Sequence, residues 1–309
     1  MYMYVMQGVS INLFIKTGKK KANELGKIYH YDLYGKREAK YDFLLENRLS
    51  TIPYKEIPNK APMYFMVQKD FDVEEAYNRG LSVNDLFIVS NVGIVTSRDG
   101  FVIDEDKETL STRIKDFFLL PKNELQKKYE LKENGSWKID EVKLKANGFD
   151  SKSISKISYR PFDDKYIYYD SNFIERSRKE VMQHLLFQDN LALMTCKQIA
   201  IDSWEHIGIT KNIADDSRVS NRTKERGYIF PLYVSKDFLG LLQFDNMQKV
   251  RIPNLKKELI NKIVEVLGVS FVSEKEANKR NFAPIDILDY IYAVLHSPKY
   301  RETYKERLS

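Results

Sequence analysis

The segment from Tyr159 to Arg178, YRPFDDKYIYYDSNFIERSR, constrains the fold of this chain more than its overall composition does. Its twenty residues hold four tyrosines and two phenylalanines, which favour pleated, half-buried strands. The same residues include three arginines and a lysine. Guanidinium groups bind phosphate oxygens or guanine edges, and aromatic rings stack on exposed bases. The segment is therefore either a nucleic-acid-binding surface or a set of strands whose arginines cover the edge of an aromatic core.

The composition is that of a globular protein without a membrane segment. The 309 residues, 43% hydrophobic and 30% charged, can form one large or two ordinary domains. No stretch approaches the ~20 apolar residues that span a bilayer, so we expect no membrane partner. The single cysteine, Cys196, excludes an internal disulfide and a multi-cysteine zinc site, and it predicts a buried thiol in a cytoplasmic protein. The net charge of +6 permits a nucleic-acid partner without requiring one.

The first half of the sequence alternates between strand-like and helix-like patterns. Residues 1–50 contain too few elements to close a core, so we interpret them as the edge of something larger. Residues 132–155 are polar and are interpreted as a connection between domains. The predicted elements are strands at 9–15, 27–33 and 63–67, helices at 37–48, 82–85, 110–119 and 123–131, and a hairpin at 91–103 with its turn at 98–100.

Strand patterns dominate after Ser155, interrupted by clear helix signatures. Ser177 and Glu180 have capping-box spacing before an apolar helix. Pro231 should confine its strand to a sheet edge or a bulge. The predicted elements are a strand at 228–234 and helices at 181–187, at 255–267 between Asn254 and Gly268, at 284–295 and after Ser297. The fold class predicted for the whole chain is mixed α+β.

The known catalytic motifs are not found in the sequence. It contains no G-x-G-x-x-G or P-loop spacing, no Asn-Pro-Pro-aromatic loop and no H-E-x-x-H pair, and its four histidines lie far apart. We therefore predict no catalytic residue, no metal ligand and no cofactor on this chain. One weak pattern remains, because Asp163 and Lys165, with Asp150 upstream, match the acids and lysine of Mg²⁺-dependent nucleases. The nuclease stays open as an alternative.

Several segments, taken in order, resemble one protein family. They are GVSINLFIKTGKK, KIYHYDLYGKREAKYDFL, LFIVSNVGIVTSRDGFVID, ISYRPFDDKYIYYD, ERSRKEVMQHLL, YIFPLYV and PIDILDYIYAVLHSPKYRETY. Together they resemble the C-terminal specificity (target-recognition) region of type ISP restriction-modification enzymes and of related N6-adenine DNA methyltransferases. The resemblance runs from about Gly8 to the last residue.

The resemblance implies that the chain is a fragment of a site-specific methyltransferase or restriction enzyme. Residues 1–50 would be the C-terminal edge of a methyltransferase-like domain, 51–131 an intermediate α/β segment, and 132–309 a mixed α/β target-recognition domain with C-terminal helices. The implied partners are double-stranded DNA and an N-terminal methyltransferase domain of the same protein. S-adenosylmethionine is expected in that missing domain. The implied function is sequence recognition that exposes one adenine for methylation.

Two groups of polar side chains are the candidate DNA-binding residues. For contact with the DNA backbone the candidates are Arg160, Lys165, Arg176, Arg178 and Lys179. For base reading the candidates are Arg218, Asn221 and Arg222 in the polar loop 215–226, and the separate Lys197-Gln198 step. Tyr159 and Phe162 are expected to pack around Pro161.

Three other functions are compatible with the sequence. A protein-protein coupling module would use the acidic region 70–108 and the apolar helix 284–295. The Mg²⁺-dependent nuclease would use Asp163 and Lys165. RNA binding would use the same basic and aromatic surface as DNA binding.

Overall fold

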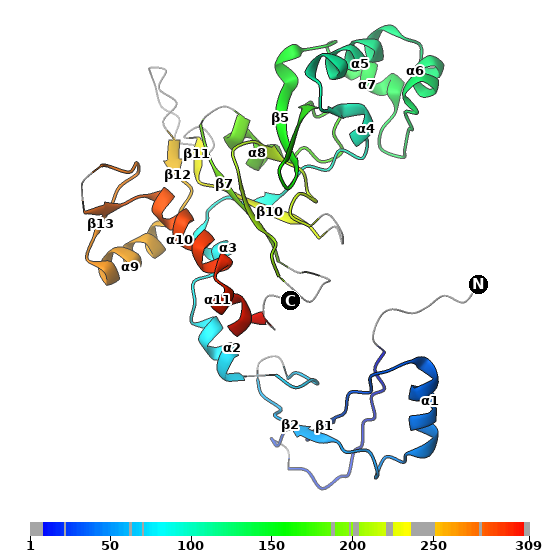
Figure 1. The fold of residues 1–309 in the computed structure, drawn as a ribbon, viewed down its shortest axis with the longest axis vertical. Helices are drawn as coiled ribbons and strands as arrows, with labels where there is room; N and C mark the ends of the chain where they lie inside the picture. The colour runs from blue at the N-terminus through cyan, green and yellow to red at the C-terminus, as the bar shows by residue number, and fades with distance from the viewer. Residues whose placement is uncertain are drawn as a thin grey trace. The chain divides into compact units, whose positions relative to one another are not determined.

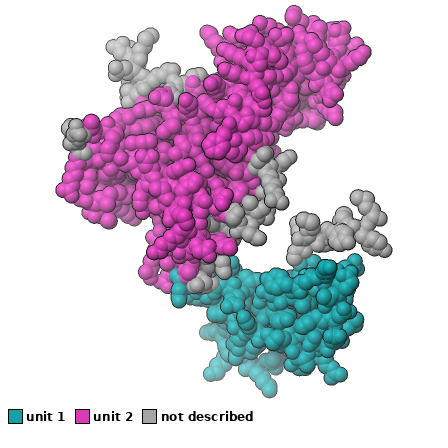
Figure 2. Space-filling view, in the orientation of Figure 1, with its two compact units in different colours: residues 1–72 teal, residues 73–309 magenta. Residues whose placement is uncertain are grey.

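The computed structural model describes residues 9–21, 23–61, 64–69, 71–186, 189–197, 199, 204–220, 225–235, 251–277 and 280–305. The chain divides into two compact units, residues 1–72 and 73–309, which Figure 2 shows in different colours. Helices and several small sheets occur together, which confirms the predicted α+β class. Among the described residues, no helix has both the length and the apolar content needed to cross a bilayer.

The first unit has little buried core of its own. Strands β1 (Ile28–His30) and β2 (Lys55–Ile57) pair antiparallel, and helix α1 (Arg37–Glu46) lies between them in the sequence, as predicted. No residue of α1 is buried. The predicted strands at 9–15 and 63–67 are wrong, because residues 9–15 and 64–67 form no strand. A strand needs a hydrogen-bonded neighbour, and the described residues of this unit offer none to either segment.

The second unit begins with short helices and with strands that belong to different sheets. Its elements as far as residue 153 are α2 (Phe71–Asn78), α3 (Val83–Leu86), β3 (Asn91–Val92), α4 (Asp99–Val102), β4 (Ile103–Asp104), α5 (Lys107–Leu119), α6 (Lys122–Tyr129), α7 (Ile139–Lys145) and the 3-10 turn η1 (Ser151–Ser153). The helices predicted at 82–85, 110–119 and 123–131 are confirmed. The hairpin predicted at 91–103 is wrong, since β3 and β4 join different sheets and a helical turn occupies the predicted reversal.

The remaining elements complete the sheets and end in two helices. They are β5 (Ile154–Arg160), β6 (Asp163–Tyr168), α8 (Lys179–Leu186), β7 (Ala192–Cys196), β8 (Ile207–Thr210), β9 (Ile213–Ala214), β10 (Gly227–Pro231), β11 (Tyr233–Ser235), β12 (Arg251–Pro253), α9 (Lys257–Leu267), β13 (Ser270–Phe271), β14 (Asn281–Phe282), α10 (Pro284–His296) and α11 (Pro298–Thr303). The predicted strand 228–234 is divided at its proline, since Pro231 is the last residue of β10.

Two four-stranded sheets organise this unit. One has the order β4-β6-β5-β9, with β9 parallel to β5, and the other has the order β3-β10-β7-β8. The hairpin β5–β6 carries most of the tyrosine-rich segment, so the strand interpretation of that segment is confirmed. Helices α4 to α7 gather beside this hairpin (Figure 1).

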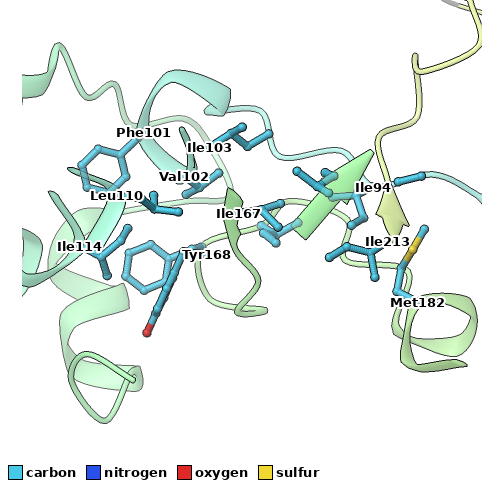
Figure 3. Packing of buried hydrophobic residues seen from close by; sticks show 14 of the residues in the cluster. Ile94, Phe101, Val102, Ile103, Leu110, Ile114, Ile167, Tyr168, Met182 and Ile213 are labelled. Atoms are coloured by element: carbon cyan, nitrogen blue, oxygen red, sulfur yellow. The ribbon is translucent and has the colours of Figure 1, made fainter. Parts of the chain in front are cut away.

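A continuous core joins the first of these sheets to the helices beside it. Figure 3 shows Ile167 between Phe101, Leu110 and Ile114 on one side and Ile94, Ile213 and Met182 on the other. Tyr168 is buried between Phe149 and Phe173, with ring centroids 6.1 and 5.1 Å away. The segment 132–155 is more than a connection, because Trp137, Ile139 and Val142 are buried in the same core.

Two of the predicted helix caps are replaced by other contacts. Asn254 does not cap α9; it is fully buried, and its Nδ2 donates to the carbonyls of Val89 and Pro231 at 2.7 Å. The Glu180 carboxylate accepts from Asn91 instead of capping α8. The predicted left-handed Gly268 after α9 and the Ser297 cap of α11 are confirmed.

Candidate nucleic-acid interface

Residues 93–94 meet two much later segments, 214–216 and 227, through backbone hydrogen bonds between the two large sheets. Gly93 N donates to Gly227 O at 3.0 Å, and Ile94 N donates to Ala214 O at 2.9 Å. Asp216 N donates to Ile94 O at 3.0 Å, and Gly227 N donates to Asp216 O at 2.7 Å. We refer to residues 93–94, 214–216 and 227 as the backbone hub. Because four backbone bonds of ordinary length join these segments, the hub fixes the backbone positions of the residues in it.

Gly93 is required by this arrangement. A Cβ at position 93 would lie 2.5 Å from both Asp215 C and Asp216 N. Side-chain carbons do not approach backbone atoms so closely, so only glycine allows the 93 and 215–216 segments to touch.

Three arginines lie next to the hub in the sequence or in segments hydrogen-bonded to its neighbours. We call Arg176, Arg178 and Arg226 the arginine cluster. Arg176 forms an antiparallel bridge with Val95, with N–O distances of 2.9 and 3.1 Å in the two directions. The Tyr169 hydroxyl donates to Ser177 O at 2.7 Å, which fixes the loop between Arg176 and Arg178. Arg226 precedes the hub residue Gly227, and its guanidinium is half exposed.

The charges of the arginine cluster act on the carboxylate of Asp216. Arg226 Nε lies 3.8 Å from Asp216 Oδ2. Burial raises the pKa of Asp216, and the charges of Arg226, Arg178 and Arg176 oppose that shift. Within the described part of the chain, Asp216 Oδ1 and Arg178 Nε are buried without a hydrogen-bond partner. Three positive charges near one carboxylate leave a net positive charge, which favours an anionic ligand.

The turn of the β5–β6 hairpin lies on the other side of the Asp215–Asp216 step. We call residues 160–163 the hairpin tip. Arg160 Nη1 donates to Asp215 Oδ1 at 2.6 Å, and the guanidinium carbon lies 3.8 Å from the ring centroid of Tyr159. Arg160 therefore anchors the hairpin tip to the hub. The expectation that Phe162 packs is wrong, because its side chain is fully exposed.

The buried Arg160–Asp215 pair predicts a pH-dependent stability. Burial raises the pKa of Asp215 to about 6, although Arg160 acts in the opposite direction. The folded state thus holds a proton that the unfolded chain releases near pH 4, so this stabilisation is full below pH 4 and lost as the pH rises towards 6. The loss is at most about 3 kcal/mol.

We expect Asp215→Asn to remove this dependence. Denaturant unfolding between pH 4 and 7 checks it, because other carboxyl groups affect both proteins equally and cancel in the difference. Parallel curves for the wild type and the variant would contradict the proton uptake at Asp215.

The remaining predicted site residues occupy different positions. Lys165 pairs with Glu105 at 3.2 Å and with Asp163 at 3.7 Å, and Arg218 Nε donates to Ser158 Oγ at 3.0 Å beside Gly208. Lys179 is exposed at the start of α8. Lys197 is exposed, with Nζ 4.1 Å from the Tyr228 ring centroid. The residues that lie outside the described part of the chain are Gln198, Asn221 and Arg222. Contact of these side chains with DNA stays a prediction.

The structure brings together residues that the sequence did not single out. Arg226 and Asp216 both lie in the loop 215–226, but nothing in their spacing indicates that they meet. Gly93 carried a signal, since an isolated glycine in a strand-like segment indicates a close backbone approach. Phe162 carried one as well, because Pro161-Phe162 occupies a two-residue hairpin turn.

The nuclease pattern is not assembled. Asp150 caps η1 before β5 begins, whereas Asp163 follows the turn at the opposite end of the hairpin. The strand β6 separates those ends by roughly 15 Å, so the two acids cannot share a metal ion. The described residues contain no group of three His, Cys, Asp or Glu side chains that could hold a metal.

Comparisons with known proteins place the chain in a family. The model of the Type ISP C-terminal specificity domain matches residues 85–309. A search of the curated proteins gave no match.

Three solved structures show the same fold. The cryo-EM structure of a DrdV–DNA complex has a TM-score of 0.57 and 18% identity over 90% of this chain. A nuclease-deletion mutant of the Type ISP restriction-modification enzyme LlaGI with a DNA substrate mimic has a TM-score of 0.56 and 19% identity over 94% of this chain. The ATP-dependent Type ISP enzyme LlaBIII bound to DNA has a TM-score of 0.55 and 18% identity over 82%.

This chain spans only 27%, 22% and 16% of those three chains, respectively. The family model covers most of the second unit, including the hub, the hairpin tip and the arginine cluster. The chain therefore belongs to the Type ISP C-terminal specificity domain family.

Proposed function

We propose that this chain is the DNA sequence-recognition module of a restriction-modification adenine methyltransferase. The observation that carries the proposal is the arginine cluster, where Arg226 lies 3.8 Å from the half-buried carboxylate of Asp216 and the charges of Arg178 and Arg176 act on the same group. Guanidinium groups bind phosphate oxygens in pairs of parallel hydrogen bonds, so such a surplus suits a DNA backbone. The three similar solved structures were determined with DNA or a DNA mimic, which supports the same ligand class.

The rigidity of the site suits sequence recognition. Phosphate contacts fix the register of a protein on a duplex, and side chains placed in that register then read the bases. The hub holds the arginine cluster by backbone bonds, so the register of those contacts would be constant. The loop 215–226 continues directly from the hub and carries three of the predicted base-reading residues, Arg218, Asn221 and Arg222.

Selection from a pool of randomised duplexes tests the proposal. We expect the chain to enrich one sequence motif over successive rounds at about 100 mM salt. Binding without enrichment would contradict a recognition role, and retention of single-stranded RNA in preference to duplex DNA would favour RNA binding.

We further propose that the first unit docks onto an N-terminal methyltransferase domain of the same protein, where S-adenosylmethionine would bind. Val9, Ile11, Leu13 and Ile15 are spaced by two, as on one face of a strand, yet each is 61–86% exposed. Leu45 of α1 is 85% exposed. Apolar area of this kind favours a protein partner. The solved relatives are several times longer than this chain, which leaves room for such a domain.

Hydrogen exchange tests this docking. We expect the amides of residues 9–15 to exchange rapidly in this chain and slowly in a longer protein that includes an upstream catalytic domain. Residues 17–21 are the internal control, since their polar side chains offer no buried face. Equal exchange of residues 9–15 in both proteins would contradict the docking.

A further inference from the structure

The hairpin tip presents one aromatic ring to solvent. Arg160 pairs with Asp163 across the turn, so Pro161 and Phe162 are its two central residues. Both are exposed, and Phe162 is fully so. Of the other large hydrophobic residues in the described second unit, only Leu144, at 87%, and Val266, at 85%, come near that exposure.

The backbone of Phe162 has a left-handed conformation that is unfavourable for a bulky side chain. Its φ is +60°, as at the second central position of a type II turn, where glycine or asparagine is normally found. A phenylalanine at this position pays steric strain and exposes an apolar ring, and no contact within the described chain compensates for either. Such local conflicts are concentrated at functional sites.

Both sides of the turn are anchored, so the ring has a rigid support. On the β5 side, Arg160 binds Asp215, and the Tyr159 hydroxyl donates to Asp99 Oδ2 at 2.9 Å. On the β6 side, Asp164 accepts from Ser158 Oγ at 2.8 Å and from Asn212 Nδ2 at 2.9 Å. A fixed ring loses little conformational freedom on binding, which is the property of a preorganised contact.

The surroundings of the ring favour a nucleobase over a protein surface. Its sequence neighbours are the exposed Pro161 and the acidic Asp163, so the turn itself offers a protein partner little apolar surface beyond the ring. The hairpin tip and the arginine cluster contact consecutive residues, because Arg160 binds Asp215 and Arg226 lies 3.8 Å from Asp216. Single apolar side chains beside phosphate-binding groups insert between base pairs in proteins that kink or open the duplex.

We infer that Phe162 is an intercalating residue, whose ring enters the base stack of a duplex held by the arginine cluster. This inference rests on the proposed function and adds the contact that deforms the DNA. The unstacked step would supply the space through which a base can leave the helix.

Phe162→Ala is expected to lower affinity for a duplex from the pool selection about tenfold or more, the usual effect of losing a base–aromatic stack. Phe162→Gly should lower it equally while leaving the denaturation midpoint unchanged or higher, because glycine relieves the positive φ. Tyr290→Ala is the control, since Tyr290 is 71% exposed on α10 and should not alter binding.

Phe162→Trp gives a direct readout. The natural tryptophans, Trp137 and Trp204, are both buried, so a tryptophan at 162 would be the exposed emitter. We expect its fluorescence to be quenched when duplex is added, and its affinity to match that of the wild type. If the wild type binds duplex but Phe162→Ala binds equally well and Trp emission is unchanged, the inference fails and the proposed function stands. If the wild type binds no duplex, both fail.

Discussion

Gly93→Ala is expected to lower the free energy of unfolding by about 1–3 kcal/mol, towards the upper end of that range. The added Cβ would meet backbone atoms of Asp215 and Asp216 at 2.5 Å. Backbone cannot rotate away as a side chain can, so the hub bonds from Ile94 to Ala214 and from Asp216 to Ile94 would lengthen. Chemical denaturation measures the loss.

Gly100→Ala is the matched control for that experiment. Nothing lies within 4 Å of a Cβ built at position 100, and the residue is helical in α4. Alanine is favoured over glycine in a helix, so we expect unchanged or slightly higher stability. Equal unfolding midpoints for the two variants would contradict the close approach at Gly93.

Replacing the arginine cluster with glutamine (Arg176→Gln, Arg178→Gln and Arg226→Gln together) is expected to weaken duplex binding at least about 100-fold at 100 mM salt. The estimate takes roughly 1 kcal/mol for each lost charge-assisted contact. The fold should survive, because Arg176 and its neighbours are held by backbone bonds rather than by their guanidinium groups. Fluorescence anisotropy with a labelled duplex measures the affinity.

A triple glutamine variant of Lys256, Lys257 and Lys262 is the control for the arginine variant. It distinguishes the loss of direct contacts with DNA from the loss of net positive charge. Lys256 is the residue before α9, and Lys257 and Lys262 lie in it; all three are exposed. Replacing them removes three positive charges, as the triple arginine variant does. We expect an affinity loss of only a few fold, since these lysines are not part of the arginine cluster and salt screens exposed charges that make no direct contact with the ligand. Equal losses in the two triple variants would show that the cluster has no specific contact with DNA.

The local elements of the second unit could be predicted from the sequence. Helices α5 and α10 follow from apolar spacing, and the Ser297 cap and Gly268 termination follow from local chemistry. The tyrosine-rich segment forms strands, because alternating aromatic residues fit a half-buried sheet.

The predictions failed where long-range contacts decide the structure. Residues 9–15 have a strand pattern but no neighbouring strand among the described residues, and Asn254 has a cap pattern but is buried between Val89 and Pro231. The hub could not be predicted, because residues 93–94 lie more than a hundred residues before 214–216 and 227, and the segments meet through backbone bonds that no side-chain pattern reveals. Single residues of the candidate site were recognised, such as Arg176 and Arg178, but their meeting with Arg226 around Asp216 was not.

The salt dependence of duplex binding tests the role of the arginine cluster most directly. Each phosphate neutralised by a protein cation contributes about −0.9 to the slope of log affinity against log salt concentration. We expect the wild type to show a steep negative slope between about 50 and 200 mM salt, and the Arg176/Arg178/Arg226 glutamine variant to be shallower by about 2.7. Parallel lines for the two proteins would contradict phosphate binding at the cluster.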